Sequence, residues 1–203
     1  MESSRAVRNW AAILIFIVGV GALVLSILYD VVPDSAIGGV SGFLQFLFEY
    51  FPGAIVVAIG FITLGFGTKQ LTSVVGTNRL GQAAFLVWAI LVLVSVVASI
   101  GNLFDDPVTI ENARNAQEFS GIAAIVVGVV AAIFVLRERI VAGFARVAMF
   151  VAVALFGLTE ILILSANAST SFLWDLPRLI GLVILGLSWW HAGARRRAPV
   201  TAK

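Results

Sequence analysis

Six apolar runs, separated by polar segments, make up most of this 203-residue chain. An α-helix needs about 20 apolar residues to cross a bilayer, and each run comes close to that length. The pattern therefore predicts an all-α integral membrane protein, a single domain over 1-203 built as a bundle of six transmembrane helices. Because connections such as 69-82 and 137-145 are short, neighbouring spans are expected to pack as three antiparallel hairpins. The expected spans are approximately 10-29, 53-68, 83-103, 119-136, 146-165 and 176-191.

The segment between the first two spans has a helical pattern of its own. From residue 37 to residue 51, apolar residues recur at steps of three and four, and polar residues repeat on another face. This pattern predicts a short amphipathic helix over approximately 37-51 that lies in the outer membrane interface. Pro52 disfavours an unbroken helix through Phe51, although one long tilted helix that includes the second span is the alternative.

The charged residues alternate in sign between successive connections. Of the 13 Lys and Arg residues, 11 fall in alternate gaps, and eight of the 11 acidic residues fall in the others. Chains that cross a bilayer repeatedly keep Lys and Arg in their cytoplasmic loops. The pattern therefore predicts the plasma (cytoplasmic) membrane, with both the N- and C-termini cytoplasmic. The basic residues that follow the pattern are Arg5, Arg8, Lys69, Arg79, Arg137, Arg139, Arg146, Arg195, Arg196, Arg197 and Lys203.

The positions of the tryptophan residues agree with the cytoplasmic side that the charges predict. Trp10, Trp88, Trp189 and Trp190 fall near the predicted cytoplasmic ends of the spans. Indole rings with an apolar body and a polar edge prefer the membrane interface. We therefore expect these four side chains to lie near the cytoplasmic boundary of the bilayer.

Span four is expected to begin outside the membrane. Asp106 followed by Pro107 is a helix start signal, because Asp caps a helix and Pro suits its first position. The polar residues up to Glu118 then form the first turns, ahead of the apolar run at 119-136.

Composition excludes several kinds of functional site. Hydrophobic residues are 61% and charged residues 12% of the chain, against about a quarter charged in soluble domains. The absence of cysteine and the single histidine exclude disulfides, thiolate metal sites and a bis-histidine haem within one chain. We expect no nucleic-acid partner, because the net charge of +2 follows from the topology signals. We also expect no enzymatic activity and no cofactor.

Glu160 is the one acidic residue inside an expected span. Arg178, a basic residue that departs from the charge alternation, is expected at a similar depth on the next span. Ionisable groups in a membrane face the bundle interior or a hydrated cavity, and they raise a functional question. The two residues are predicted to form either a structural ion pair or a proton- or cation-binding site.

Small residues form a stripe on span four: Ser120, Ala124, Gly128 and Ala132. Such a stripe lets two membrane helices approach closely, either inside one chain or between subunits. After the last span, Arg195, Arg196 and Arg197 are expected to bind anionic lipid headgroups, at about 1 kcal/mol for each basic residue near the surface.

These features favour a non-enzymatic accessory subunit or helix-packing scaffold in the membrane. Its expected partners are the lipid bilayer and either a second copy of the chain or another membrane subunit. The alternative is a small transporter or channel that uses Glu160 together with Arg178.

Overall fold

A computed structural model describes residues 3-31, 51-67, 73-101, 107-141, 143-165 and 176-195. Within these ranges the regular structure is helical and contains no strand, which confirms the all-α prediction for this part of the chain. The helix expected over 37-51 lies outside the described residues, apart from Phe51 at the start of α4. The helices are α1 (Ser3–Val31), α4 (Phe51–Phe66), α5 (Arg79–Gly101), α6 (Pro107–Glu138), the 3-10 helix η2 (Gly143–Arg146), α7 (Ala148–Ser165) and α8 (Leu176–Arg195).

Two of these helices are long and apolar enough to cross a membrane. They are the Trp10–Leu28 part of α1 and the whole of α6, whereas the other four are shorter apolar helices. Only 39% of the most apolar window of α1 and 28% of that of α6 is buried inside the fold. A large exposed apolar surface is typical of a membrane or partner contact, so these helices favour a membrane protein.

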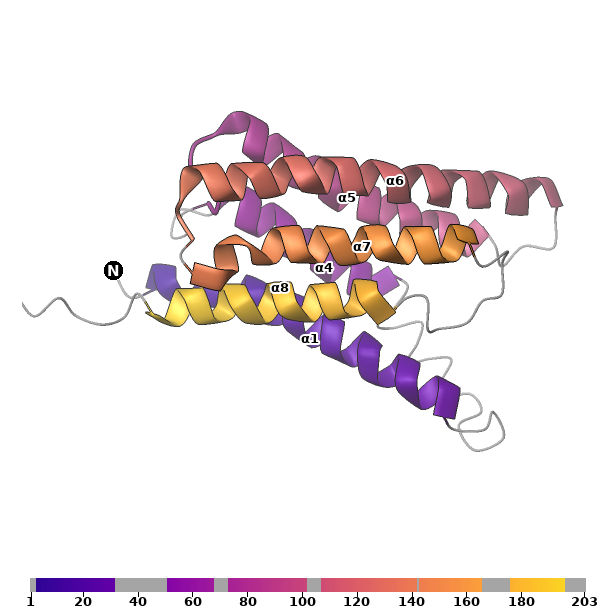
Figure 1. Cartoon of the computed structure of the whole chain (residues 1–203), viewed down its shortest axis with the longest axis horizontal. Helices are drawn as coiled ribbons and strands as arrows, with labels where there is room; N and C mark the ends of the chain where they lie inside the picture. Colours follow the sequence, from indigo (N-terminus) through magenta and orange to yellow (C-terminus); the bar gives the residue numbers. More distant parts are fainter. Residues whose placement is uncertain are drawn as a thin grey trace, which may run out of the picture.

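The six α-helices form a closed ring. Each helix packs on the next one in the sequence, from α1 and α4 through to α7 and α8, and α8 packs on α1. In Figure 1 the N-terminus, the junction between α6 and α7 and the C-terminal end of α8 lie at the left end of the molecule. We call this the basic end, because Arg79, Arg137 and Arg146 lie there.

A short segment after α4 covers the basic end. Ser73 donates a side-chain hydrogen bond to the carbonyl of Gly65, and the Val74 amide donates to the carbonyl of Leu64 at 2.9 Å. These bonds satisfy carbonyls that the last turn of a helix leaves unpaired. Val74 and Val75 are then buried, at 1% and 0% exposed, so this segment forms part of the core.

Hydrogen bonds between neighbouring helices fix the basic end further. Asn78 accepts from the amides of Leu80 and Gly81, both at 3.1 Å, and so caps the start of α5. The same side chain donates to Glu138 Oε1 at 3.1 Å and ties α5 to the end of α6. Arg146 donates to the carbonyl of Leu136 through Nε at 3.0 Å and caps α6 from η2.

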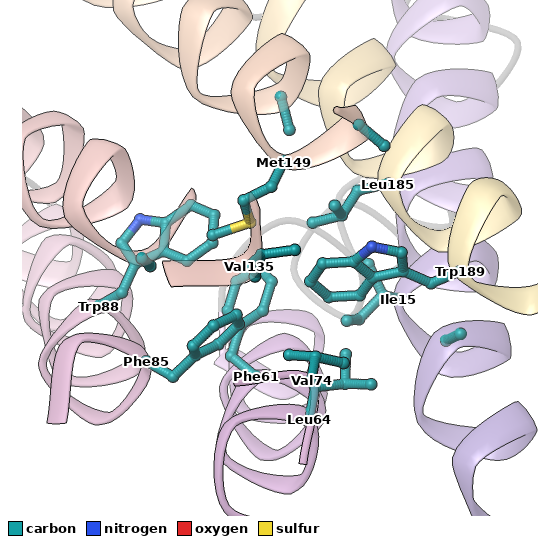
Figure 2. Close-up of a cluster of buried hydrophobic side chains, with 14 of the residues drawn as sticks. Ile15, Phe61, Leu64, Val74, Phe85, Trp88, Val135, Met149, Leu185 and Trp189 are labelled. Carbon is teal, nitrogen blue, oxygen red and sulfur yellow. The ribbon is translucent and has the colours of Figure 1, made fainter. Parts of the chain in front are cut away.

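Aromatic side chains fill the basic half of the ring (Figure 2). Trp88 stacks on Phe61 with ring centroids 4.3 Å apart, and Trp189 tilts against Phe85 at 6.2 Å. Trp189 also donates its indole N–H to the carbonyl of Ala145 at 2.8 Å. Offset and tilted aromatic pairs of this kind add about 0.5–1.5 kcal/mol beyond their buried area.

The four tryptophans expected near the cytoplasmic boundary differ in exposure, and their depth in the membrane stays a prediction. Trp88 and Trp189 are buried, at 1% and 2% exposed, whereas Trp10 and Trp190 are exposed. Burial of Trp189 is possible because its N–H has an internal acceptor, which removes the usual cost of a buried polar group.

Glycines allow α1 and α8 to approach closely. A Cβ atom on Gly186 would lie 2.6 Å from the backbone nitrogen of Phe16 and 2.8 Å from its Cα. A Cβ on Gly19 would lie 3.0 Å from the backbone nitrogen of Val183. Since a helix backbone cannot move as a flexible side chain does, a glycine at 186 is a condition for this contact.

Gly186→Ala is therefore expected to loosen the contact between α8 and α1. We expect a loss of roughly 1–3 kcal/mol in the free energy of unfolding, as overpacked cores show. The matched control is Gly157→Ala on α7, where a Cβ would meet Ile125 at an ordinary 3.8 Å. Circular dichroism during SDS titration in mild detergent measures both variants, and equal midpoints would contradict the expectation.

Candidate functional site

Thr159 and Glu160 connect α7 to both of its neighbours. Successive residues of an α-helix point about 100° apart, so adjacent side chains on α7 reach different helices. Thr159, at 0% exposed, accepts a hydrogen bond on its side-chain oxygen from the backbone amide of Arg178 at 3.0 Å. This amide belongs to the first turn of α8 and has no acceptor within its own helix, so Thr159 caps α8 from α7.

Glu160 extends in the other direction, to α6. Its side chain is half-buried, and a Cβ atom on Gly121 would lie 2.6 Å from both Cδ and Oε1 of the carboxylate. The carboxylate therefore occupies space that any residue other than glycine would fill. Ser120, the neighbour of Gly121, is buried and donates its hydroxyl to the carbonyl of Gln117 at 3.0 Å.

The backbone of Arg178 lies beside α7, close to Glu160. The hydrogen bond to Thr159 brings the backbone of Arg178 against the residue that precedes Glu160. The ion pair between the guanidinium group and the carboxylate stays a prediction. What the described contacts establish is a polar junction of three helices, formed by Gly121 of α6, Thr159 and Glu160 of α7, and Arg178 of α8.

This polar junction lies away from the aromatic core. In Figure 1 the α7 end at Ser165 and the α8 start at Leu176 are at the right, opposite the basic end. A carboxylate placed among aromatic side chains would lose its hydration without compensation. Its position beside the glycine backbone and near the start of α8 is a less costly place for a polar group.

The small-residue stripe of α6 packs inside the fold. A Cβ on Gly128 would lie 2.8 Å from Val153 of α7 and 3.6 Å from Trp88 of α5. Ser120 and Ala132 are buried, and Ala124 packs against the core. The stripe therefore supports close contact between α6 and its neighbours in the same chain.

The remaining site predictions are placed only in part. Arg195 is the last residue of α8, while Arg196 and Arg197 lie outside the described residues, so the headgroup role stays a prediction. Across the described ranges, no three His, Asp or Glu side chains gather as metal ligands would.

An apolar groove lies between α5 and α6. Its volume is about 340 Å³. Aliphatic side chains suit the methylene groups of a lipid chain or of another helix, and they offer no polar group to orient a soluble ligand. The groove is lined by Ile90, Leu93, Val94, Val97, Ala98 and Ala116.

Sequence patterns missed two parts of this arrangement. The sequence does not predict the role of Gly121, because a single glycine in an apolar helix carries no signal of a contact with a carboxylate. The sequence also does not predict that Thr159 caps α8, since its partner is 19 residues away on another helix.

Comparisons with protein-family models, with characterised proteins and with solved structures each found no match to this chain.

Proposed function

We propose that all six helices cross the membrane, with the basic end in the cytoplasm. The two longest helices support a membrane location, and the four shorter helices lie beside them in the same ring. Short apolar helices span a bilayer when they pack against longer ones and the bilayer thins locally. Alternation of basic and acidic connections supports the orientation.

Single cysteines introduced into this cysteine-free chain test the topology. In right-side-out vesicles, a membrane-impermeant maleimide is expected to label Arg114→Cys and Asn167→Cys. Thr77→Cys and Arg137→Cys, at the basic end, are expected to react only after permeabilisation. Labelling of Arg137→Cys in sealed vesicles would contradict the orientation, and labelling of Asn167→Cys only after permeabilisation would contradict six spans.

Within this topology, we propose that the protein is a non-enzymatic accessory subunit or helix-packing scaffold of the plasma membrane. The observation that carries the proposal is the filled interior of the ring. Large side chains such as Phe61, Trp88 and Met149 occupy it, and Val74 with Val75 covers its basic end. By contrast, the outer surface is rich in exposed apolar side chains, which are available for lipid, for another subunit or for a second copy.

Native mass spectrometry of the protein, released from its native membranes in mild detergent, tests this function. The expected result is a complex heavier than the 21.5 kDa chain, containing a second copy or a membrane subunit in fixed stoichiometry. A monomer accompanied only by lipid, over a range of mild detergents, would contradict the scaffold role.

The second candidate function is a small transporter or channel. It is favoured by one observation, the half-buried Glu160 carboxylate against the backbone at Gly121. A carboxylate at membrane depth is costly and often belongs to a proton or cation pathway. Under this candidate, the polar junction opens toward the outer half of the protein, and the basic half would have to rearrange for transport.

Proton flux into liposomes separates the two candidates. If the protein transports protons, Glu160→Gln is expected to lower the flux by about tenfold or more, because the amide cannot exchange the proton. The matched control is Glu138→Gln, a half-buried carboxylate at the basic end that accepts from Asn78. Equal flux through the wild type and Glu160→Gln would remove the transport role of this carboxylate.

A further inference from the structure

Three arginines gather where α5 begins and α6 ends. Arg79 is the first residue of α5. Arg137 and Arg139 precede and follow Glu138, the last residue of α6. The side chain of Asn78 donates to Glu138 Oε1 at 3.1 Å and holds these two helix ends together. The three arginines therefore lie close to one another at the basic end (left end of the molecule in Figure 1), and we call them the arginine cluster.

The nearby carboxylate does not neutralise the arginine cluster. All three side chains are exposed, and across the part of the chain that the structure describes they make no hydrogen bond or ion pair. Glu138 accepts from the neutral amide of Asn78. By contrast, Arg114, an exposed arginine near the other end of α6, pairs with Glu118 at 3.0 Å. The cluster therefore presents three guanidinium groups that are available to an anion.

Two members of the cluster occupy positions that do not favour arginine. Arg139 has a φ of 53°, in the left-handed region where glycine is usual. Arg79 places a positive charge in the first turn of α5, where the helix dipole is already positive and attracts an anion. The positive-inside rule asks only for basic residues in cytoplasmic connections, not for three at one junction of two helices. Topology and helix stability therefore leave the clustering unexplained.

Exposed apolar side chains adjoin the cluster and indicate the kind of anion. Leu80, which follows Arg79, is 70% exposed, and Phe144 of η2 is 61% exposed. The hydrogen bond from Arg146 to the carbonyl of Leu136 holds η2 against the end of α6. A phospholipid presents an anionic phosphate beside apolar chains, whereas a soluble anion gains nothing from apolar neighbours. Guanidinium groups bind phosphate oxygens with paired hydrogen bonds, so the chemistry of this surface complements a phospholipid.

We propose that the arginine cluster binds the headgroup phosphate of an anionic phospholipid, which bridges α5 and α6 at the basic end. The inference rests on the proposed membrane topology, because this topology brings the basic end to the inner surface of the bilayer. Basic residues between membrane helices on that side bind anionic headgroups in other proteins. The inference deepens the scaffold proposal, since it names a lipid partner and a defined site. A site between two helices holds one lipid, whereas a terminal run such as 195-197 attracts many.

Native mass spectrometry of the full chain in mild detergent, titrated with phosphatidylglycerol or with phosphatidylcholine, tests the site. We expect one retained phosphatidylglycerol per chain, with an affinity at least about tenfold above that for zwitterionic phosphatidylcholine. Arg79→Gln and Arg137→Gln are each expected to lower this affinity about fivefold, because each removes one guanidinium group. The matched control is Arg114→Gln, an exposed position near the other end of α6, with an expected change below about twofold. The side chains of Arg79 and Arg137 make no described hydrogen bond, so the fold does not depend on them.

Three results would overturn the proposal. Equal affinity for the two lipids would show that the headgroup charge is not recognised, and an equal loss with Arg114→Gln would show general charge attraction. Displacement of the lipid by an excess of inorganic phosphate would assign the cluster to a soluble anion. Maleimide labelling reports the topology independently, and the mass of the native complex reports the scaffold role. Loss of lipid selectivity alone would therefore remove this inference and leave the proposed function intact.

Discussion

The contact between α1 and α8 closes the whole structure. Every other extensive helix contact joins sequence neighbours, whose connection already keeps them close, whereas this one joins the two ends of the described chain. Loop closure over so long a segment costs entropy, which only favourable packing offsets. The backbone of Phe16 reaches α8 because residue 186 is glycine, so closure of the ring depends on a missing side chain.

The two halves of the ring differ in the side chains that fill them. At the basic end, aromatic stacking and the segment at Ser73–Val75 fill the interior, and hydrogen bonds from Asn78 and Arg146 cap the helix ends. The other half holds the carboxylate of Glu160, which the aromatic half has no means to solvate. The polar junction and the aromatic core are therefore separated along the axis of the bundle.

The sequence identifies Glu160 and Arg178 as candidate residues, but it does not predict the contacts that they make. Hydropathy alone identifies Glu160 as exceptional and predicts Arg178 at a similar level, because the level of a residue follows from its position along antiparallel helices. The side of α7 from which Glu160 projects depends on helix rotation, which packing decides. The roles of Gly121 and Thr159 could not be predicted for the same reason. Each residue contacts another helix, and apolar helices can pack in many rotations.

The sequence by itself determined the helical class, the approximate position of the six α-helices and the start of α6 at Pro107, because hydropathy and capping act over a few residues. It did not predict the 3-10 helix η2. Only the tertiary structure decided which tryptophans are buried. Trp88 and Trp189 have the same interfacial preference as Trp10, but Phe61 and the carbonyl of Ala145 offer them a stack and an acceptor. Tertiary packing also turned the small-residue stripe inward and left Phe119, Val126 and Ile133 of α6 exposed. Both faces are apolar, and only contact with neighbouring helices distinguishes them.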